Sequence, residues 1–270
     1  MKGCTIPQLC DSGLVFKLNQ RILAIMDTSL NKFISDSGFC SRREADRYIE
    51  ECRVTINDKD AHKGNRVKEG DVVKIDGERV GKKKTAAVYL LLNKPKGVTC
   101  TTDQKDKTNI VDFVNYKTRI FPIGRLDKLS EGLIFLTNDG DIVNKILRAG
   151  NGHEKEYIVT VDQPINSEFI QKMRNGVKIL GTVTQKCFVK QEGDNRFRII
   201  LTQGLNRQIR RMCEALGFRV TSLKRIRIMN ITLSGIAPGK WRYFSAQEID
   251  AVHEMLKHSS KTAEGEGMGE

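Results

Sequence analysis

One carboxylate of the chain stands between two cations in a loop bounded by glycines. Asp127 follows Arg125 and precedes Lys128, and the segment runs from Gly124 to Gly132. Positive neighbours favour the ionised form of a carboxylate, which is the form that a nucleophile or an electrostatic stabiliser needs. The same spacing is typical of an ordinary ion-pair cluster on a surface, and spacing alone favours that simpler interpretation.

A second candidate is a basic segment at residues 203–212, which opens a predicted helix. At about 100° per residue, Ile209, Met212 and their apolar neighbours share one face of this helix. The opposite face carries three arginines, Arg207, Arg210 and Arg211. A solvated face normally mixes charges of both signs, whereas residues 203–227 hold seven Lys or Arg and one Glu. The pattern therefore indicates an anion-binding face as much as a merely solvated one.

Two further segments give weaker signals. Tyr157 stands at the start of a predicted strand, where most tyrosines pack in a core, although an aromatic ring beside a basic surface also stacks on an unpaired base. The turn at residues 92–97 carries Lys94 and Lys96, and by itself it indicates only a loop. The four His show no metal-ligand spacing and the seven Cys form no C-x-x-C pair, so we predict neither a metal site nor a disulfide framework.

The elements that must position these residues fall into two predicted units. In the first, Ser41 and Glu44 have the spacing of a capping box, and they begin a helix whose polar side carries three arginines. These are Arg42, Arg43 and Arg47. Strands are predicted at residues 54–56 and 72–75, and the polar, lysine-rich stretch that follows has the composition of a connector.

In the second unit, strand-like runs alternate with helical patterns, which predicts an α+β or mixed α/β domain. The strands are expected at residues 88–92, 132–137, 157–161 and 197–201, and the helices at 142–147, 168–173 and 208–216. The predicted boundaries are an extension at 1–28, a first domain at 29–80, a linker at 81–87, a second domain at 88–257 and a disordered tail at 258–270. The extension is expected to be disordered or to reflect a start codon placed too far upstream, with Met26 as the alternative start.

The charge of the chain points to an anionic partner. Lys and Arg number 46 against 33 Asp and Glu, a formal net charge of +13, so nucleic acid is favoured ahead of an acidic membrane surface. The longest apolar run, residues 86–92, is far shorter than the roughly 18 residues that span a bilayer. The first residues lack a signal-peptide pattern. We therefore expect a soluble cytoplasmic protein without membrane contact.

Taken in order, these segments resemble the RsuA-like family of pseudouridine synthases. Residues 92–97 are similar to the first motif of that family, 124–133 to its catalytic loop, 155–157 to its tyrosine motif and 206–212 to its arginine motif. Residues 29–80 are similar to an S4 RNA-binding domain. Within the family, residues 139–157 and 203–206 most resemble the F-type synthases of the large ribosomal subunit. Leu205 and Ser29 stand where relatives often have an arginine.

The resemblance implies a fold and a chemistry. The fold would be α+β, with a small S4-like domain before a larger catalytic domain that has a mixed, mainly antiparallel sheet and flanking helices. Asp127 would be the nucleophile that breaks the glycosidic bond of a flipped uridine, after which uracil turns and C5 rejoins the sugar. Tyr157 would stack on the uracil or help to remove the C5 proton, and Arg210 would pair with Asp127 and fix its direction. No cofactor and no metal would be needed.

The implied substrate is a looped or bulged uridine in a ribosomal RNA stem-loop, most directly of large-subunit (23S) RNA, with transfer RNA as a possible second target. Phosphate contacts would position this RNA without specifying its sequence. The residues expected to bind RNA are Arg125, Leu126, Lys128, Arg207, Gln208, Ile209, Arg211, Lys94, Lys96, Arg42, Arg43 and Arg47. We expect the protein to act as a monomer.

An alternative from another class is a non-catalytic S4-type RNA-binding factor in ribosome assembly. Such a factor would use the first domain and the basic helix while its active site stays idle. The joint presence of Asp127, Tyr157 and Arg210 argues against this alternative, because a pure binder needs none of them together.

Overall fold

The computed structural model describes residues 27–81, 86–257 and 259. The chain divides into two compact units, Met1–Thr85 and Ala86–Glu270. The expected extension at 1–28 lies outside the described residues apart from 27 and 28, and so does the expected tail at 258–270 apart from 259. Residues 82–85 of the expected linker are likewise outside them.

The first unit packs two helices on a small antiparallel sheet. The Ser41 hydroxyl accepts a hydrogen bond from the main-chain N–H of Glu44 at 3.1 Å, so the helix begins where the sequence predicts. Leu30, Ile34 and Ile49 of the helices share a buried core with Val54 and Ile75 of the sheet. The helices are α2 (Leu30–Asp36) and α3 (Arg42–Glu50), and the sheet has the order β3 (Lys59–Asp60), β2 (Val54–Ile56), β5 (Val73–Ile75), β6 (Glu78–Val80). Strand β1 (Thr28–Ser29) pairs separately with β4 (Arg66–Val67).

The second unit is built on a nine-stranded sheet with the order β13-β14-β10-β15-β9-β7-β17, to which β16 and β8 add at β15 and β9. Within the described residues every strand pair of this sheet is antiparallel except β9 with β15. The expected fold class is therefore confirmed: α+β with a mixed, mainly antiparallel sheet.

The elements of the second unit alternate between strands and short helices. The strands are β7 (Tyr89–Lys94), β8 (Phe121–Ile123), β9 (Glu131–Thr137), β10 (Lys155–Val161), β13 (Phe188–Gly193), β14 (Arg196–Leu201), β15 (Val220–Ile228), β16 (Ile231–Thr232) and β17 (Trp241–Tyr243). A separate hairpin pairs β11 (Lys178–Ile179) with β12 (Thr182–Val183). The helices are α4 (Ile110–Val114), α5 (Gly140–Leu147), α6 (Ser167–Asn175), α7 (Gln208–Ala215) and α8 (Ala246–Met255), with a 3-10 turn at Ala149–Asn151.

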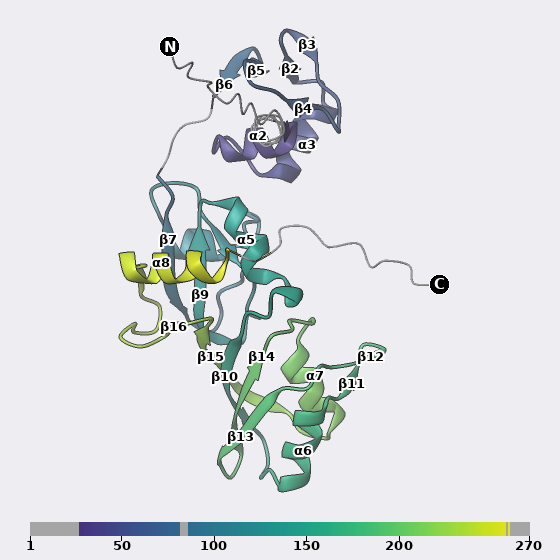
Figure 1. Cartoon of the computed structure of the whole chain (residues 1–270), viewed down its shortest axis with the longest axis vertical. Helices are drawn as coiled ribbons and strands as arrows, with labels where there is room; N and C mark the ends of the chain where they lie inside the picture. The colour runs from purple at the N-terminus through teal and green to yellow at the C-terminus, as the bar shows by residue number, and fades with distance from the viewer. Residues whose placement is uncertain (1–26, 82–85, 258, 260–270) are drawn as a thin grey trace, which may run out of the picture. The chain divides into compact units, whose positions relative to one another are not determined.

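The central residues of β7 (90–92) and of β9 (133–136) form unbroken apolar runs because both faces of these strands are covered. Leu91 and Phe135 point to the face covered by α5 and α8, where they share a core with Val252. Leu92 and Ile134 point to the opposite face and pack with Ile110 of α4 and its neighbours. Helix α8 crosses β7 and β9 in the view of Figure 1.

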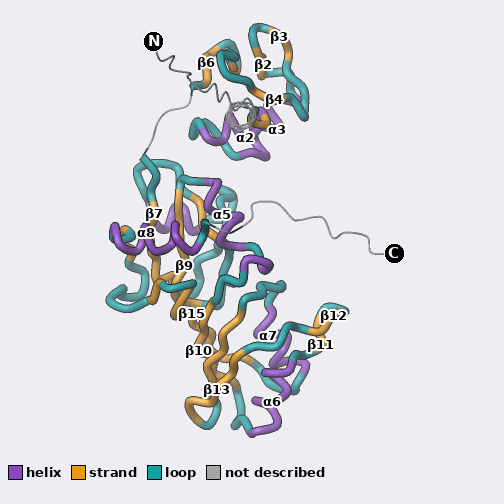
Figure 2. The backbone as a smooth tube through the Cα atoms, viewed as in Figure 1, coloured by secondary structure: helices purple, strands orange, loops and turns teal. Residues whose placement is uncertain are grey.

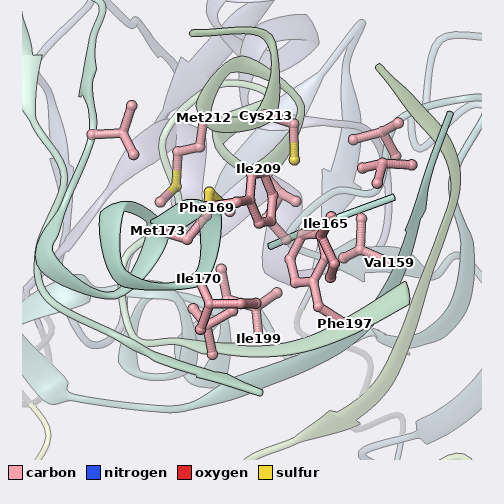
Figure 3. Packing of buried hydrophobic residues seen from close by; sticks show 14 of the residues in the cluster. Val159, Ile165, Phe169, Ile170, Met173, Phe197, Ile199, Ile209, Met212 and Cys213 are labelled. Carbon is pink, nitrogen blue, oxygen red and sulfur yellow. The ribbon is translucent and has the colours of Figure 1, made fainter. Parts of the chain in front are cut away.

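The other half of the sheet is covered by α6 and α7. In Figure 3, Phe169 and Met173 of α6 meet Ile209 and Met212 of α7 over the buried side chain of Phe197. The apolar face predicted for the helix at 208–216 is thus the face that packs on the sheet. Strands β10 and β15 run through the middle of the second unit (Figure 2). The half-buried Tyr157 of β10 packs against this core and also against the core beneath α4, so it stands where the two meet.

The parallel contact between β9 and β15 depends on a glycine. Gly132 of β9 pairs with Arg225 of β15 and has a φ of +109°, a conformation that favours glycine. A Cβ atom at this position would lie 2.2 Å from the Arg225 carbonyl oxygen. The close approach fixes the loop before Gly132 against the half of the sheet that carries Tyr157.

In the described part of the chain, none of the helices has the length and apolar character that crossing a membrane requires.

Candidate active site

A cavity of about 480 Å³ opens between the loop at residues 124–130 and the start of α7. Its volume is in the range of small-ligand sites. Asp127, Tyr157 and Arg210 all line it, so the structure brings the three residues from distant parts of the chain together. Five of the residues expected to bind RNA line the same cavity: Arg125, Leu126, Arg207, Gln208 and Ile209. Much of the remaining wall is leucine, from Leu147, Leu201, Leu205 and Leu223.

The loop that carries Asp127 is held on both sides. The carbonyl oxygen of Asp127 accepts a hydrogen bond from the Ser130 N–H at 2.9 Å, which closes a tight turn. Leu126 is buried, and its N–H donates to the sulfur of Cys100 at 3.3 Å. The Asp127 side chain itself is 35% exposed. A fixed backbone thus presents an accessible carboxylate to the cavity, as a group that reacts with a bound substrate requires.

The cations that face Asp127 are not its neighbours in the sequence. The Nε of Arg210 lies 3.6 Å and the Nη1 of Arg207 lies 3.7 Å from the Oδ2 atom of Asp127. Arg125 and Lys128, in contrast, are exposed. The interpretation of Asp127 as a carboxylate between its flanking cations is therefore corrected, because the start of α7 supplies the ion pairs.

Arg210 was expected opposite the apolar face of its helix, on a side that the spacing left open as anion-binding or merely solvated. For this residue the structure excludes the solvated alternative. The residue is only 7% exposed, because the first turn of α7 packs against the Asp127 loop as well as against the sheet. Its Nη2 donates to the Ser130 hydroxyl at 3.1 Å and its Nη1 to the Val220 carbonyl at 3.2 Å. The buried Nε makes no hydrogen bond. Burial lowers the pKa of Arg210 while the Asp127 carboxylate opposes that shift, and the guanidinium stays charged.

The turn before α7 is strained and pinned. Arg207 has a φ of +50°, which is unusual for a residue with a side chain, and this conformation begins the helix. The buried Gln208 side chain accepts a hydrogen bond from the Leu205 N–H at 3.1 Å and donates to the Gln203 side chain at 3.3 Å. Gln208 and Ile209 therefore shape the cavity wall from a buried position, and the exposed Arg207 stands at its rim.

Lys94 was expected to bind RNA, and the structure contradicts this expectation. The side chain is fully buried, and its ammonium donates to the carbonyls of Pro95 at 3.0 Å and Val98 at 2.8 Å. Burial lowers the pKa of Lys94. These bonds hold the turn in which the Gly97 N–H donates to the Lys128 carbonyl at 2.8 Å, so Lys94 supports the Asp127 loop. The neighbouring Lys96 is exposed.

In the first unit, the three expected arginines lie on the exposed side of α3. Arg47 is 3.6 Å from the Glu44 carboxylate and 3.8 Å from that of Glu51. Arg42 donates to the Ser29 hydroxyl at 3.3 Å. Arg43 is exposed as well. The polar side predicted for this helix is therefore a solvated surface that carries positive charge.

Two cationic residues of the cavity were missed as site residues. Lys155 is 8% exposed and Arg225 is 4% exposed, and both line the cavity. Burial, together with the nearby charge of Arg225, lowers the pKa of Lys155 to about 8. Lys155 could have been found, because it stands two residues before Tyr157 and alternate residues of a strand share a face. Arg225 could not have been found from the sequence, because only the pairing of β15 with β10 places it opposite Tyr157.

Comparison with known proteins assigns the chain to a family. Residues 88–215 match the family of the RNA pseudouridylate synthases, and residues 28–73 match the S4 domain. The dual-specificity RNA pseudouridine synthase RluF of Escherichia coli K12 is 59% identical over 232 residues, which cover 86% of this chain and 80% of that protein. The chain belongs to the RNA pseudouridine synthases. The expected resemblance to the RsuA-like family and its F-type members is thereby confirmed.

More distant members support the same assignment. The ribosomal large subunit pseudouridine synthase B of Bacillus subtilis is 32% identical to this synthase over 238 residues, 85% of this chain and 97% of that one. A crystal structure of a pseudouridylate synthase superposes with a TM-score of 0.63 at 27% identity, covering 83% of this chain and 99% of the other. The synthase is thus an RNA-modifying isomerase with an S4 domain. Among the described residues, no three His, Cys, Asp or Glu side chains gather as they would around a metal ion.

Proposed function

We propose that this synthase converts specific uridines of ribosomal RNA, most directly of the large subunit, to pseudouridine with Asp127 as the nucleophile. The observation that carries the proposal is the Asp127 carboxylate, which is accessible and paired with Arg207 and Arg210 in a cavity shared with Tyr157. The Bacillus subtilis relative is named for the large ribosomal subunit, which supports that substrate. RluF is named for dual specificity, which supports a second RNA target, and we propose transfer RNA.

The proposed reaction replaces the bond between C1′ and N1 of uracil by a bond between C1′ and C5. A uridine turned out of its stack enters the cavity, and a carboxylate oxygen of Asp127 attacks C1′ while the C1′–N1 bond breaks. The detached uracil turns, its C5 atom attacks C1′, and the bond to Asp127 breaks. The proton on C5 then leaves and N1, which was bonded to the sugar in uridine, takes up a proton. The product has the same atoms as the substrate, so the proposed reaction consumes no cofactor.

The surrounding residues fit these steps. Arg210 is fixed by Ser130 and Val220, so its guanidinium orients the carboxylate instead of moving with solvent. Tyr157 offers a ring for stacking on the base and a hydroxyl for the C5 proton. The leucine walls exclude water from the broken glycosidic bond. Because turning a base out of a helix costs a few kcal/mol, the substrate uridine belongs in a loop or bulge.

We further propose that the S4 unit captures the RNA through Arg42, Arg43 and Arg47. Near the cavity, phosphates are contacted by Arg125, Lys128, Arg207, Arg211 and Lys96. This assignment rests on their charge and, for all but the half-exposed Arg211, on their exposure. The proposal includes a monomer acting in the cytoplasm.

The decisive experiment replaces Asp127 by Asn. Tritium release from C5-labelled uridine in a ribosomal RNA stem-loop should fall at least about 100-fold, while RNA affinity stays within a few-fold, because the carboxylate supplies bond making and not most of the binding. Turnover by Asp127→Asn above about one hundredth of the wild-type rate would remove Asp127 from this role. Mapping of pseudouridine in ribosomal RNA, with and without the gene, identifies the target. A wild-type protein that binds this RNA but forms no pseudouridine would support the non-catalytic assembly factor.

A further inference from the structure

Two cations in the cavity wall have no carboxylate partner among the residues that the structure describes. Lys155 and Arg225 are each more than nine-tenths buried, and neither takes part in an ion pair with the described acids. Taking a charge out of water costs several kcal/mol unless an opposite charge compensates it. The arrangement is therefore one that an anion in the cavity would stabilise.

Both side chains keep hydrogen-bond donors for such an anion. The Lys155 ammonium has three protons, and its protein acceptors are the carbonyls of His153 at 2.9 Å and Thr202 at 3.4 Å. Arg225 donates from Nε to the Leu133 carbonyl at 2.7 Å, whereas its buried Nη2 has no partner. An unpaired donor at a buried position indicates a missing acceptor.

The strand register gathers these donors around Tyr157. Tyr157 pairs with Arg225 across β10 and β15, and Lys155 lies two residues earlier on the same strand. The register shifts directly before this pair, so that Ile226 of β15 is an extra residue between Arg225 and Arg227. Such bulges re-aim side chains beside active sites. The two cations therefore face the region in which Tyr157 would meet the base.

We propose that Lys155 and Arg225 stabilise the negative charge that uracil carries while it is detached from the sugar. This inference rests on the proposed function. When the bond from Asp127 to C1′ forms and the C1′–N1 bond breaks, the electron pair of the broken bond stays on uracil and spreads over O2 and O4. Bound uridine lacks this charge, so the two cations lower the barrier to bond breaking more than they tighten binding.

A phosphate group fits these two residues less well. A phosphate carries its full charge throughout the reaction, and the exposed Arg125 and Arg207 meet it at the rim of the cavity. The walls near the buried cations include Leu201 and Leu223, which suit a flat base better than a hydrated phosphate. The structure therefore favours the base as the anion.

The test compares two leaving bases in the full-length protein. The variants Lys155→Met and Lys155→Arg are assayed with stem-loops that contain uridine or 5-fluorouridine at the target position, under single turnover and at saturating RNA. Fluorine withdraws electrons and stabilises the detached base, so the breaking of the C1′–N1 bond depends less on the cations. Because C5 of 5-fluorouridine has no proton to lose, conversion of both substrates is measured as loss of the starting nucleoside after digestion of the RNA. Lys155→Met should slow conversion of uridine about 10- to 100-fold and conversion of 5-fluorouridine clearly less, and Lys155→Arg should recover most of the rate. The matched control is Lys178→Met, which removes an exposed lysine of the separate β11–β12 hairpin.

The outcomes separate this inference from the proposed function. An equal slowing of both substrates would mean that Lys155 only maintains the fold, and it would overturn the inference. A loss of RNA affinity that shrinks with added salt would reveal a phosphate contact and overturn it as well. If the wild-type protein formed no pseudouridine, the proposed function would fail first. If the wild-type protein is active and Lys155→Met matches it, only the inference fails.

Discussion

The arginines of α3 and the buried cations of the cavity at Asp127 carry the same charge in opposite surroundings. Arg42 and Arg43 lie in solvent, whereas Arg210 and Arg225 are buried and held by protein hydrogen bonds. Charges in solvent interact weakly and are screened by salt, while fixed buried charges are screened little and need no reorganisation. From this comparison we expect the first set to supply attraction for RNA and the second to supply geometry for the reaction.

The largest expected effect comes from adding one methyl group where the buried region is tightest. Gly132→Ala places a Cβ atom 2.2 Å from the Arg225 carbonyl at a positive φ, so β9 and β15 must separate. We expect a loss of about 3 kcal/mol or more in the free energy of unfolding, from backbone strain and overpacking together. The measurement is urea unfolding followed by circular dichroism.

The control for this substitution is Gly70→Ala in the first unit. Gly70 also has a positive φ, +89°, but nothing lies within 4 Å of an added Cβ. We expect it to lose only about 1 kcal/mol, from strain alone. Equal losses at the two glycines would show that the close approach of β9 and β15 is not needed for stability.

The second prediction tests whether Arg210 acts through the planar geometry of its guanidinium or only through its charge. Arg210→Lys keeps the charge but loses the planar group that bonds Ser130 and Val220 while facing Asp127. The single-turnover rate should fall about 10- to 100-fold, or about 1.4–2.7 kcal/mol, at any ionic strength and with RNA affinity nearly unchanged.

Arg211→Lys on the same helix is the control, because Arg211 bonds only the Asn206 side chain and carbonyl and should behave as a simple charge. Both variants could instead lose the same small amount of RNA affinity and keep the wild-type single-turnover rate. Arg210 would then act like the solvated arginines of α3, which would contradict the contrast between solvated and buried cations.

A third effect uses pH to remove one buried charge. The pKa of Lys155 is lowered to about 8 by burial and by Arg225, so its charge is present below that pH and lost above it. The His153 ring nearby stays neutral in this range, because burial and Lys155 lower its pKa. The single-turnover rate should fall about tenfold per pH unit above 8, and Lys155→Arg should flatten that fall. RNA affinity should not change over this pH range, since the arginines remain charged. A fall in RNA affinity parallel to the fall in rate would contradict the separation of RNA binding from the buried charges.

The smallest expected effect comes from replacing the exposed arginines of α3. Replacing Arg42, Arg43 and Arg47 by Gln should weaken RNA binding and reduce the log–log salt slope by roughly 2 to 3, at about 0.7–0.9 per phosphate contact. The rate at saturating RNA should not change. The control is the triple Lys178→Gln, Lys186→Gln and Lys190→Gln, which removes equal charge from exposed positions of the second unit. An unchanged slope in the arginine triple would mean that α3 does not touch the RNA backbone.

Local patterns in the sequence predicted much of this fold. The Ser41 cap, the strand at 54–56 and the apolar face of the helix at 208–216 follow from short-range spacing, and each is formed as predicted. The burial of Arg210 could not be predicted, because a helical wheel assumes packing on one side only. Lys94 was misjudged for a related reason: its partners are carbonyls of its own turn, which sequence does not display. The antiparallel register that places Arg225 opposite Tyr157 and the parallel register that places it opposite Gly132 are equally hidden, since both join segments far apart in the chain.

Because β17 pairs with β7, the sheet of the second unit is completed late during synthesis on the ribosome. The last strand of the first unit ends at Val80, whereas the nine-stranded sheet needs Trp241–Tyr243 to pair along β7. At about 5–20 residues per second, the roughly 160 residues between these points take about 10–30 s to make. A nascent chain therefore carries a finished first unit for many seconds before it has an intact cavity. The order of emergence from the ribosome means that the ability to hold an anionic partner is acquired before the ability to change one.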